Sequence, residues 1–161
     1  MKSTLVVYFS RTGYTRRVAE EIARAAGADC VEIHEHSSRK GFLGYWRSAR
    51  EALRGTAIEI KPGQLNPRDY ALVVLGTPVW ASNMSSPMRA YIDRHRRDFA
   101  RIALFCTQGG SGAEKVLQRM ATLTDQTPVA TAFFSDSEID HGRHAGKLAA
   151  FVAAIAARKA A

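Results

Sequence analysis

A hydroxyl-rich hexapeptide near the start of the chain has the residue types that can hold a phosphate group. It consists of Ser10, Arg11, Thr12, Gly13, Tyr14 and Thr15. Hydroxyl groups donate hydrogen bonds to phosphate oxygens, glycine lets the backbone turn and approach an anion closely, and a helix N-terminus is partly positive. The apolar run Leu5–Phe9 precedes the hexapeptide, and an amphipathic stretch follows it as far as Ala26. The pattern predicts an anion site between a strand and a helix, although a simple helix N-cap also explains such a turn.

Two further polar segments follow apolar runs later in the chain. The first consists of Thr77, Pro78, Val79, Trp80, Ala81, Ser82 and Asn83, and the second of Thr107, Gln108, Gly109, Gly110, Ser111 and Gly112. The first of these offers a flat indole ring, and the second offers glycine-rich backbone that can approach the polar edge of a ring in a ligand. Loops after successive parallel strands emerge at one edge of a sheet. Together the three segments predict a ligand with a phosphate tail and a flat, hydrogen-bonding head.

The elements that must position these segments read as five alternations of strand and helix. Strands are expected at Thr4–Phe9, Cys30–His34, Ala71–Gly76, Ile102–Cys106 and Val129–Phe134. Helices are expected at Thr15–Ala26, Gly44–Leu53, Pro87–Arg97, Gly112–Leu123 and His141–Lys159. Short, near-continuously apolar strands are typical of a parallel sheet covered on both faces. The fold class predicted is α/β, a doubly wound five-stranded parallel sheet of order 2-1-3-4-5, in a single domain over residues 1–161.

These three segments, placed in this way after strands, resemble those of the flavodoxins and flavodoxin-like FMN proteins over nearly the whole chain. The family pattern Ser/Thr-x-Thr-Gly-x-Thr is matched by Ser10, Thr12, Gly13 and Thr15. The resemblance implies that the first segment binds the FMN phosphate, that Trp80 stacks on the flavin ring, and that the third segment meets the edge of the ring. The cofactor-binding residues expected are therefore Ser10, Arg11, Thr12, Gly13, Tyr14, Thr15, Thr77, Pro78, Val79, Trp80, Ala81, Ser82, Asn83, Thr107, Gln108, Gly109, Gly110 and Gly112. No side chain is nominated as catalytic, because the flavin does the chemistry.

Three features depart from the electron carriers of that family. The third segment has no aromatic residue to cover the outer face of the ring, no glycine lies between Thr77 and Pro87, and the net charge is +8 where typical carriers are acidic. Electron transfer through bound FMN to a redox partner protein or a small-molecule electron acceptor is the function expected. An NAD(P)H-dependent quinone or flavin reductase is the alternative, and a non-enzymatic regulatory binding protein is a second one.

Composition and residue spacing also bear on the location of the protein, its charged partners, metal binding and disulfides. No apolar run approaches the ~20 residues of a membrane span, and the N-terminus has no room for a signal peptide, so a cytoplasmic location is expected. The positive charge is interpreted as a solvated surface, with a phosphorylated cosubstrate or an acidic partner as the alternative. No nucleic-acid motif accompanies it, and the histidines lack the spacing of a metal site. Cys30 and Cys106 are expected to be reduced core residues, and the long connection over residues 35–68 to be either a packed helix or a flap.

Overall fold

The computed structural model describes residues 2–34 and 65–157. Its elements are β1 (Lys2–Tyr8), α1 (Tyr14–Ala26), β2 (Asp29–Glu32), the 3-10 helix η2 (Pro67–Asp69), β3 (Tyr70–Trp80), β4 (Asn83–Met84), α3 (Ser86–His95), β5 (Ile102–Gln108), α4 (Ala113–Thr124), β6 (Thr131–Ser135), α5 (Asp136–Asp140) and α6 (Ala145–Ala157). The expected helix Gly44–Leu53 and most of the long connection lie outside the described residues.

Five parallel strands form the sheet in the order β2-β1-β3-β5-β6. Because β5 and β6 correspond to the fourth and fifth predicted strands, this order confirms the predicted doubly wound arrangement 2-1-3-4-5. Val6 of β1 lies between Cys30 of β2 and Val74 of β3, and Leu75 of β3 pairs with Leu104 of β5. The two-residue β4 adds an antiparallel partner at the end of β3. Because helices cover both faces, the three central strands are almost continuously buried.

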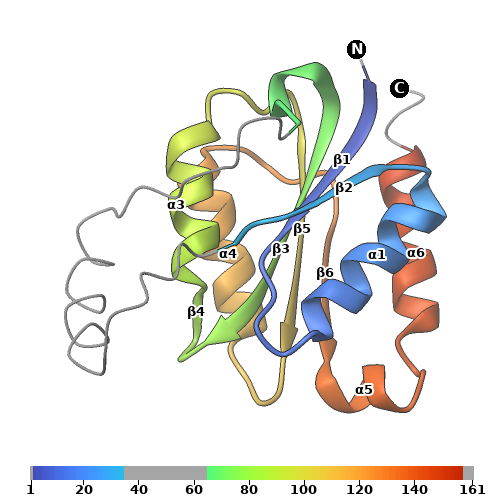
Figure 1. Ribbon diagram of the computed structural model, residues 1–161. Helices are drawn as coiled ribbons and strands as arrows, with labels where there is room; N and C mark the ends of the chain where they lie inside the picture. The colour runs from blue at the N-terminus through green and yellow to red at the C-terminus, as the bar shows by residue number, and fades with distance from the viewer. Residues whose placement is uncertain (1, 35–64, 158–161) are drawn as a thin grey trace.

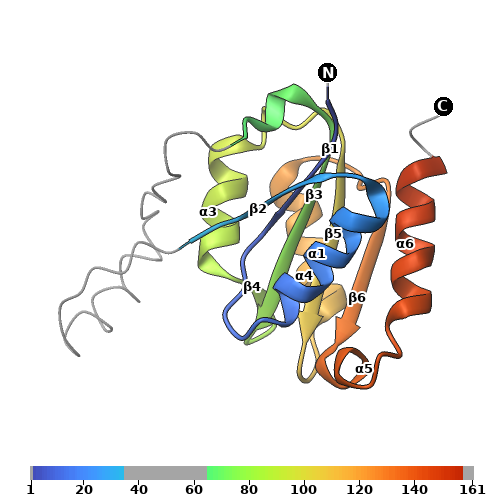
Figure 2. The ribbon, with the colours of Figure 1, turned by 45° about the vertical axis from the view of Figure 1, so that its right-hand side comes forward.

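Two hydrophobic cores flank the sheet, and alternate residues of each strand enter one or the other. On one face, Leu5 and Val7 pack with residues of α3 and α4. On the other face, Val6 packs with residues of α1 and α6. Figure 1 shows these two helix pairs on opposite sides of the sheet, and the turned view of Figure 2 agrees. The period-2 alternation of a strand explains why adjacent residues of β1 serve different cores.

The segment after β3 differs from expectation. A loop was expected over Thr77–Asn83, but β3 continues as far as Trp80, and β4 pairs back onto it through Val79–Met84 and Trp80–Asn83. The two residues between the strands, Ala81 and Ser82, have left-handed backbones with φ of 47° and 59°. Two successive residues with positive φ make the tight turn that joins hairpin strands, so the segment is ordered by strand pairing.

The C-terminal region also differs from expectation, which was one helix over His141–Lys159. Instead α5 begins directly after β6, because Ser135 and Glu138 form a reciprocal capping box. The ammonium of Lys147 and the N–H of Ser135 hold the pKa of Glu138 at about 2. Gly142, with φ of 67°, follows α5, and α6 starts only at Ala145. A left-handed glycine after a helix is a common stop signal, which accounts for the break.

The two cysteines differ in their exposure to solvent. Cys106 is buried as expected, but Cys30 is exposed because β2 is an edge strand, so it is not a core residue. Neither cysteine is in a disulfide. Across the part of the chain that the structure describes, no helix combines the length and the apolar character required to cross a membrane.

Candidate functional site

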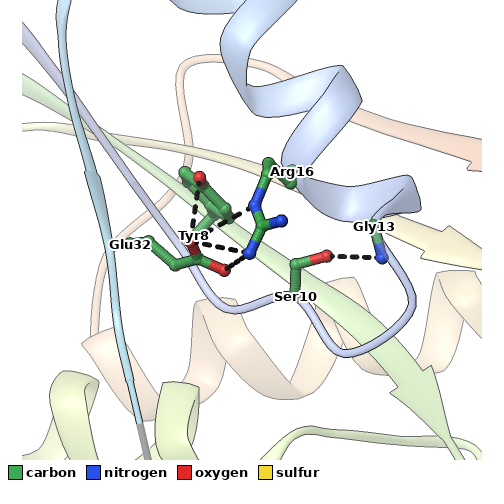
Figure 3. A network of polar contacts seen from close by, with 5 residues as sticks. All are labelled: Tyr8, Ser10, Gly13, Arg16 and Glu32. Carbon is green, nitrogen blue, oxygen red and sulfur yellow. Dashed lines mark hydrogen bonds and ion pairs between the residues drawn. The ribbon is translucent and has the colours of Figure 1, made fainter.

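The first segment makes a tight turn between β1 and α1. The hydroxyl of Ser10 accepts a hydrogen bond from the N–H of Gly13 at 3.1 Å, as Figure 3 shows. Gly13 is the N-cap of α1 with φ of 100°, and no described side chain caps this helix. The N–H groups in the first turn of a helix have no partners within the helix. The N-terminus of α1 therefore offers donors and a positive dipole end to an anion.

A polar network beside this turn attaches α1 to the edge of the sheet. The guanidinium of Arg16 contacts both carboxylate oxygens of Glu32, with Nη2 2.8 Å from Oε1 and Nε 3.3 Å from Oε2 (Figure 3). The hydroxyl of Tyr8 donates to the same carboxylate at 3.4 Å. Burial, with the charge of Glu32, raises the pKa of Tyr8 to about 12, so the phenol stays neutral. Since Arg16 is paired with a carboxylate, it holds α1 and β2 together and adds little net charge to the turn.

The second segment carries Trp80 on the β3–β4 hairpin. Its indole is partly buried, with the ring of Phe9 edge-on at 5.5 Å between centroids and the guanidinium of Arg11 over the ring at 5.6 Å from its centroid. Thr77 is fully buried, and its hydroxyl accepts from the N–H of Ser85 and lies 3.0 Å from the Ser85 hydroxyl. The Thr77 hydroxyl is therefore used inside the protein, whereas Trp80 lies at the rim.

The third segment follows β5 and leads into α4. The side-chain oxygen of Gln108 accepts a hydrogen bond from the N–H of Ala113 at 3.0 Å and so holds the start of that helix. Gly112 is the N-cap of α4 with φ of 105°. Between them Gly109 and Gly110 are exposed. The exposed glycine backbone leaves N–H and C=O groups accessible at this edge.

The three segments meet at the carboxyl edge of the parallel strands, at the lower end of the sheet in Figure 1. The hydroxyls of Thr15 and Thr107, both buried, lie 2.7 Å apart and join the first segment to the third. The contact of Arg11 with Trp80 joins the first to the second. A Cβ added at Gly112 would lie 2.9 Å from the hydroxyl of Ser82, which joins the second to the third. The segments that the sequence singled out are thus in contact with one another at this edge.

Acidic residues after β6 and one arginine of α4 also border this edge. The hydroxyl of Tyr14 donates to Asp140 at 3.0 Å, and Asp136 lies close to Gly109, with Oδ2 3.0 Å from the place of an added Cβ. Burial raises the pKa of the Asp136 carboxyl, and the charge of Asp140 adds to the effect. Arg119 of α4 reaches the hairpin and donates to the carbonyl of Ser82 at 3.0 Å. Asp136 comes two residues after the predicted strand Val129–Phe134, so its place at this edge can be read from the sequence, but nothing in the sequence places Arg119 here.

Cysteine catalysis and metal binding find little support among the described residues. Burial raises the pKa of the Cys106 thiol to about 12, so this cysteine stays protonated. Among residues 2–34 and 65–157, no group of three or more His, Cys, Asp or Glu side chains gathers as metal ligands would. The exposed arginines Arg94, Arg96 and Arg97 lie at and just after the end of α3, away from the edge that carries the three segments.

Comparisons with known proteins agree with the fold. The family model described as Flavodoxin matches residues 3–152. A flavoprotein in complex with FMN from Lactobacillus acidophilus NCFM is 23% identical, covers 88% of this chain and 98% of its own, and superposes with a TM-score of 0.65. A putative flavoprotein from Bacteroides uniformis ATCC 8492 is 25% identical over 84% of this chain and 91% of its own, with a TM-score of 0.59. A flavodoxin from the domain Archaea is 17% identical over 99% of both chains, with a TM-score of 0.60. No curated protein matches the sequence.

Proposed function

The chain belongs to the flavodoxin family, and we propose that it binds FMN at the carboxyl edge of its sheet and transfers electrons through that cofactor. The observation that carries the proposal is the convergence of the three segments, which contact one another in all three pairs. Each segment suits a different part of the cofactor. The proposal therefore depends on the whole surface and not on one motif.

The residues present fit the phosphate end of FMN. The N-terminus of α1 has no side-chain cap among the described residues, and no atom lies within 4 Å of an added Cβ at Gly13. Thr12 is exposed beside it and can donate its hydroxyl. Arg11, which is also exposed, adds positive charge. A dianionic phosphate would be held by backbone N–H groups, hydroxyls and one guanidinium, in place of a dense cluster of cations.

The residues also fit the ring end. Trp80 offers part of its indole for stacking, and Gly109 and Gly110 offer exposed backbone to the hydrogen-bonding edge of the ring. When bound, FMN supplies the redox chemistry, since its ring accepts and releases one or two electrons. The chain binds and orients the cofactor, and it partly screens the ring from water. No side chain here needs to act as a general acid or base for electron transfer.

The exposed third segment favours a reductase as the second candidate. Gly109, Gly110 and Ser111 are all exposed and carry no ring that would cover a flat ligand from outside. An NAD(P)H-dependent quinone or flavin reductase needs such an open face for its substrate. Anaerobic mixing of the oxidised holoprotein with NADPH separates the two functions. Rapid loss of the visible absorption supports a reductase, and loss over many minutes supports a carrier that serves a redox partner protein.

Titration of the apoprotein with FMN tests the proposed cofactor. Flavin fluorescence and the visible spectrum report binding, and riboflavin, which lacks the phosphate, provides the comparison. We expect FMN to bind more tightly than riboflavin, and Thr12→Ala to weaken the binding of FMN without weakening that of riboflavin. Thr122→Ala, which removes an exposed hydroxyl from the last turn of α4, should change neither affinity. Flavin that elutes entirely free of the protein in gel filtration contradicts the proposal and favours a colourless regulatory protein. The cytoplasmic location stays a prediction, for which cell fractionation is the test.

A further inference from the structure

The turn that joins β3 to β4 has an unusual sequence for its backbone. Ala81 and Ser82 both lie in the left-handed region, with φ of 47° and 59°. Two-residue hairpin turns of this kind favour asparagine and glycine, because other side chains make positive φ unfavourable. Neither residue has that advantage. The local sequence therefore disfavours the conformation, and contacts from elsewhere in the fold must hold it.

One such contact comes from α4. The guanidinium of Arg119 donates from Nη1 to the carbonyl of Ser82 at 3.0 Å. The N-cap of the same helix, Gly112, lies so close that an added Cβ would be 3.0 Å from the Cα of Ser82. The backbone of the turn therefore rests directly on the start of α4. This close approach is possible because position 112 has no side chain.

The other side of the hairpin is anchored in the core. Met84 of β4 is 6% exposed and belongs to the hydrophobic core on the face of α3 and α4. The next residue, Ser85, is fully buried and hydrogen-bonded to Thr77 through both its N–H and its hydroxyl. The strand ends are thus fixed by burial, and Arg119 acts on the turn itself. Strained backbone that is held by its surroundings is concentrated at functional sites.

The residue that this turn positions is Trp80, which pairs with Asn83 across the hairpin. We propose that Arg119 is a positioning residue, which holds the strained Ala81–Ser82 turn so that the indole of Trp80 is already in place before a flat ligand stacks on it. A preorganised aromatic ring loses less conformational freedom on binding, so the ligand binds more tightly. The inference rests on the proposed function, because it assigns a role within the flavin site. Arg119 acts through the backbone of the hairpin and needs no contact with the ligand.

Two readings of Arg119 predict different results. If it acts by charge, Arg119→Gln should weaken the binding of dianionic FMN and leave that of riboflavin unchanged. If it positions Trp80, Arg119→Gln should weaken both ligands by the same factor, about threefold to tenfold. Lys115→Gln removes the same charge from an exposed position on the same helix and is the matched control. We expect the control to bind both ligands as the unaltered protein does.

A rescue variant tests the mechanism directly. Replacing Ala81 by Asn and Ser82 by Gly supplies the residue types that favour this turn by themselves. Added to Arg119→Gln, the pair A81N and S82G should restore both affinities to within about twofold of the unaltered protein. A loss confined to FMN, or a folded triple variant that is not restored, overturns the proposal. Unchanged affinities in Arg119→Gln overturn it as well.

The apoprotein gives a readout that does not depend on flavin. In a Trp46→Phe background, the remaining tryptophan emission comes from Trp80, since the chain has two tryptophans. Arg119→Gln should raise the acrylamide quenching constant of that emission, and the A81N and S82G pair should lower it again. An unchanged quenching constant contradicts the positioning role. Failure of the unaltered protein to bind flavin would instead refute the proposed function, so the two failures are distinguishable.

Discussion

Gly13 and Gly112 are a natural pair for a quantitative test, because each is the N-cap of a helix with nearly the same backbone. Their φ angles are 100° and 105°, and their ψ angles are −15° and 1°. Their surroundings differ. An added Cβ meets no atom within 4 Å at Gly13, whereas at Gly112 it meets the Oγ, Cα and Cβ of Ser82 at 2.9, 3.0 and 3.1 Å. Alanine at each position therefore separates the cost of the backbone conformation from the cost of the contact.

The backbone cost is common to both variants. A non-glycine residue in this region costs about 1–2 kcal/mol, and replacing glycine recovers about 0.4–1 kcal/mol because the unfolded chain becomes less flexible. Gly13→Ala should therefore lower the free energy of unfolding by about 1 kcal/mol. At Gly112 the new methyl group also presses on Ser82, and such overpacking costs a further ~1–3 kcal/mol. Gly112→Ala should lower the free energy of unfolding by about 2–4 kcal/mol.

Urea unfolding of the two apoproteins, followed by circular dichroism, measures both values at once. Thermal unfolding gives a second estimate, since each kcal/mol corresponds to about 2–4 °C in a chain of this size. We expect the urea midpoint to be lowest for Gly112→Ala, intermediate for Gly13→Ala and highest for the unaltered protein. Equal midpoints for the two variants, or a lower midpoint for Gly13→Ala, would refute the inference that the second and third segments are in close contact.

Three further outcomes are expected. The pKa of Glu138 is about 2 in the folded protein and near 4.5 when unperturbed, so its contribution to stability is present above pH 4.5 and is lost as the pH falls toward 2. In Glu138→Ala, the urea midpoint should therefore decline less steeply over that pH interval than in the unaltered protein. A decline as steep as in the unaltered protein contradicts the assignment. An aromatic disulfide reagent should label the exposed Cys30 in the native protein and label Cys106 only in urea, and two labelled thiols under native conditions would show that Cys106 is accessible. Arg11→Gln should weaken the binding of FMN about threefold to tenfold and that of riboflavin less, because the proposed site places the Arg11 guanidinium at the phosphate, which riboflavin lacks. Arg24→Gln, at the far end of α1, is the control, and an equal effect on FMN would point to net charge alone.

The division into five parallel strands with helices on both faces was determined by the sequence alone. Short apolar runs that alternate with amphipathic stretches leave few arrangements for a chain of this length, because a parallel strand must be covered on both faces. The position of Gly13 after Leu5–Phe9 and the polar segments after the third and fourth predicted strands were visible for the same reason. Each of these features depends on neighbours within a few residues. Local patterns of that kind can be read without a structure.

The tertiary structure decided how the segments are held and which side chains support them. Ala81 and Ser82 do not favour a hairpin turn by themselves, and they adopt it because Gly112 and Arg119, which follow them by about thirty residues or more, lie against them. The use of the Thr77 hydroxyl inside the protein likewise follows from its pairing with Ser85 across β4. These contacts join residues that periodicity and spacing do not relate. They form only when packing of the helices on the sheet brings distant parts of the chain together, so the precision of the site belongs to the fold as a whole.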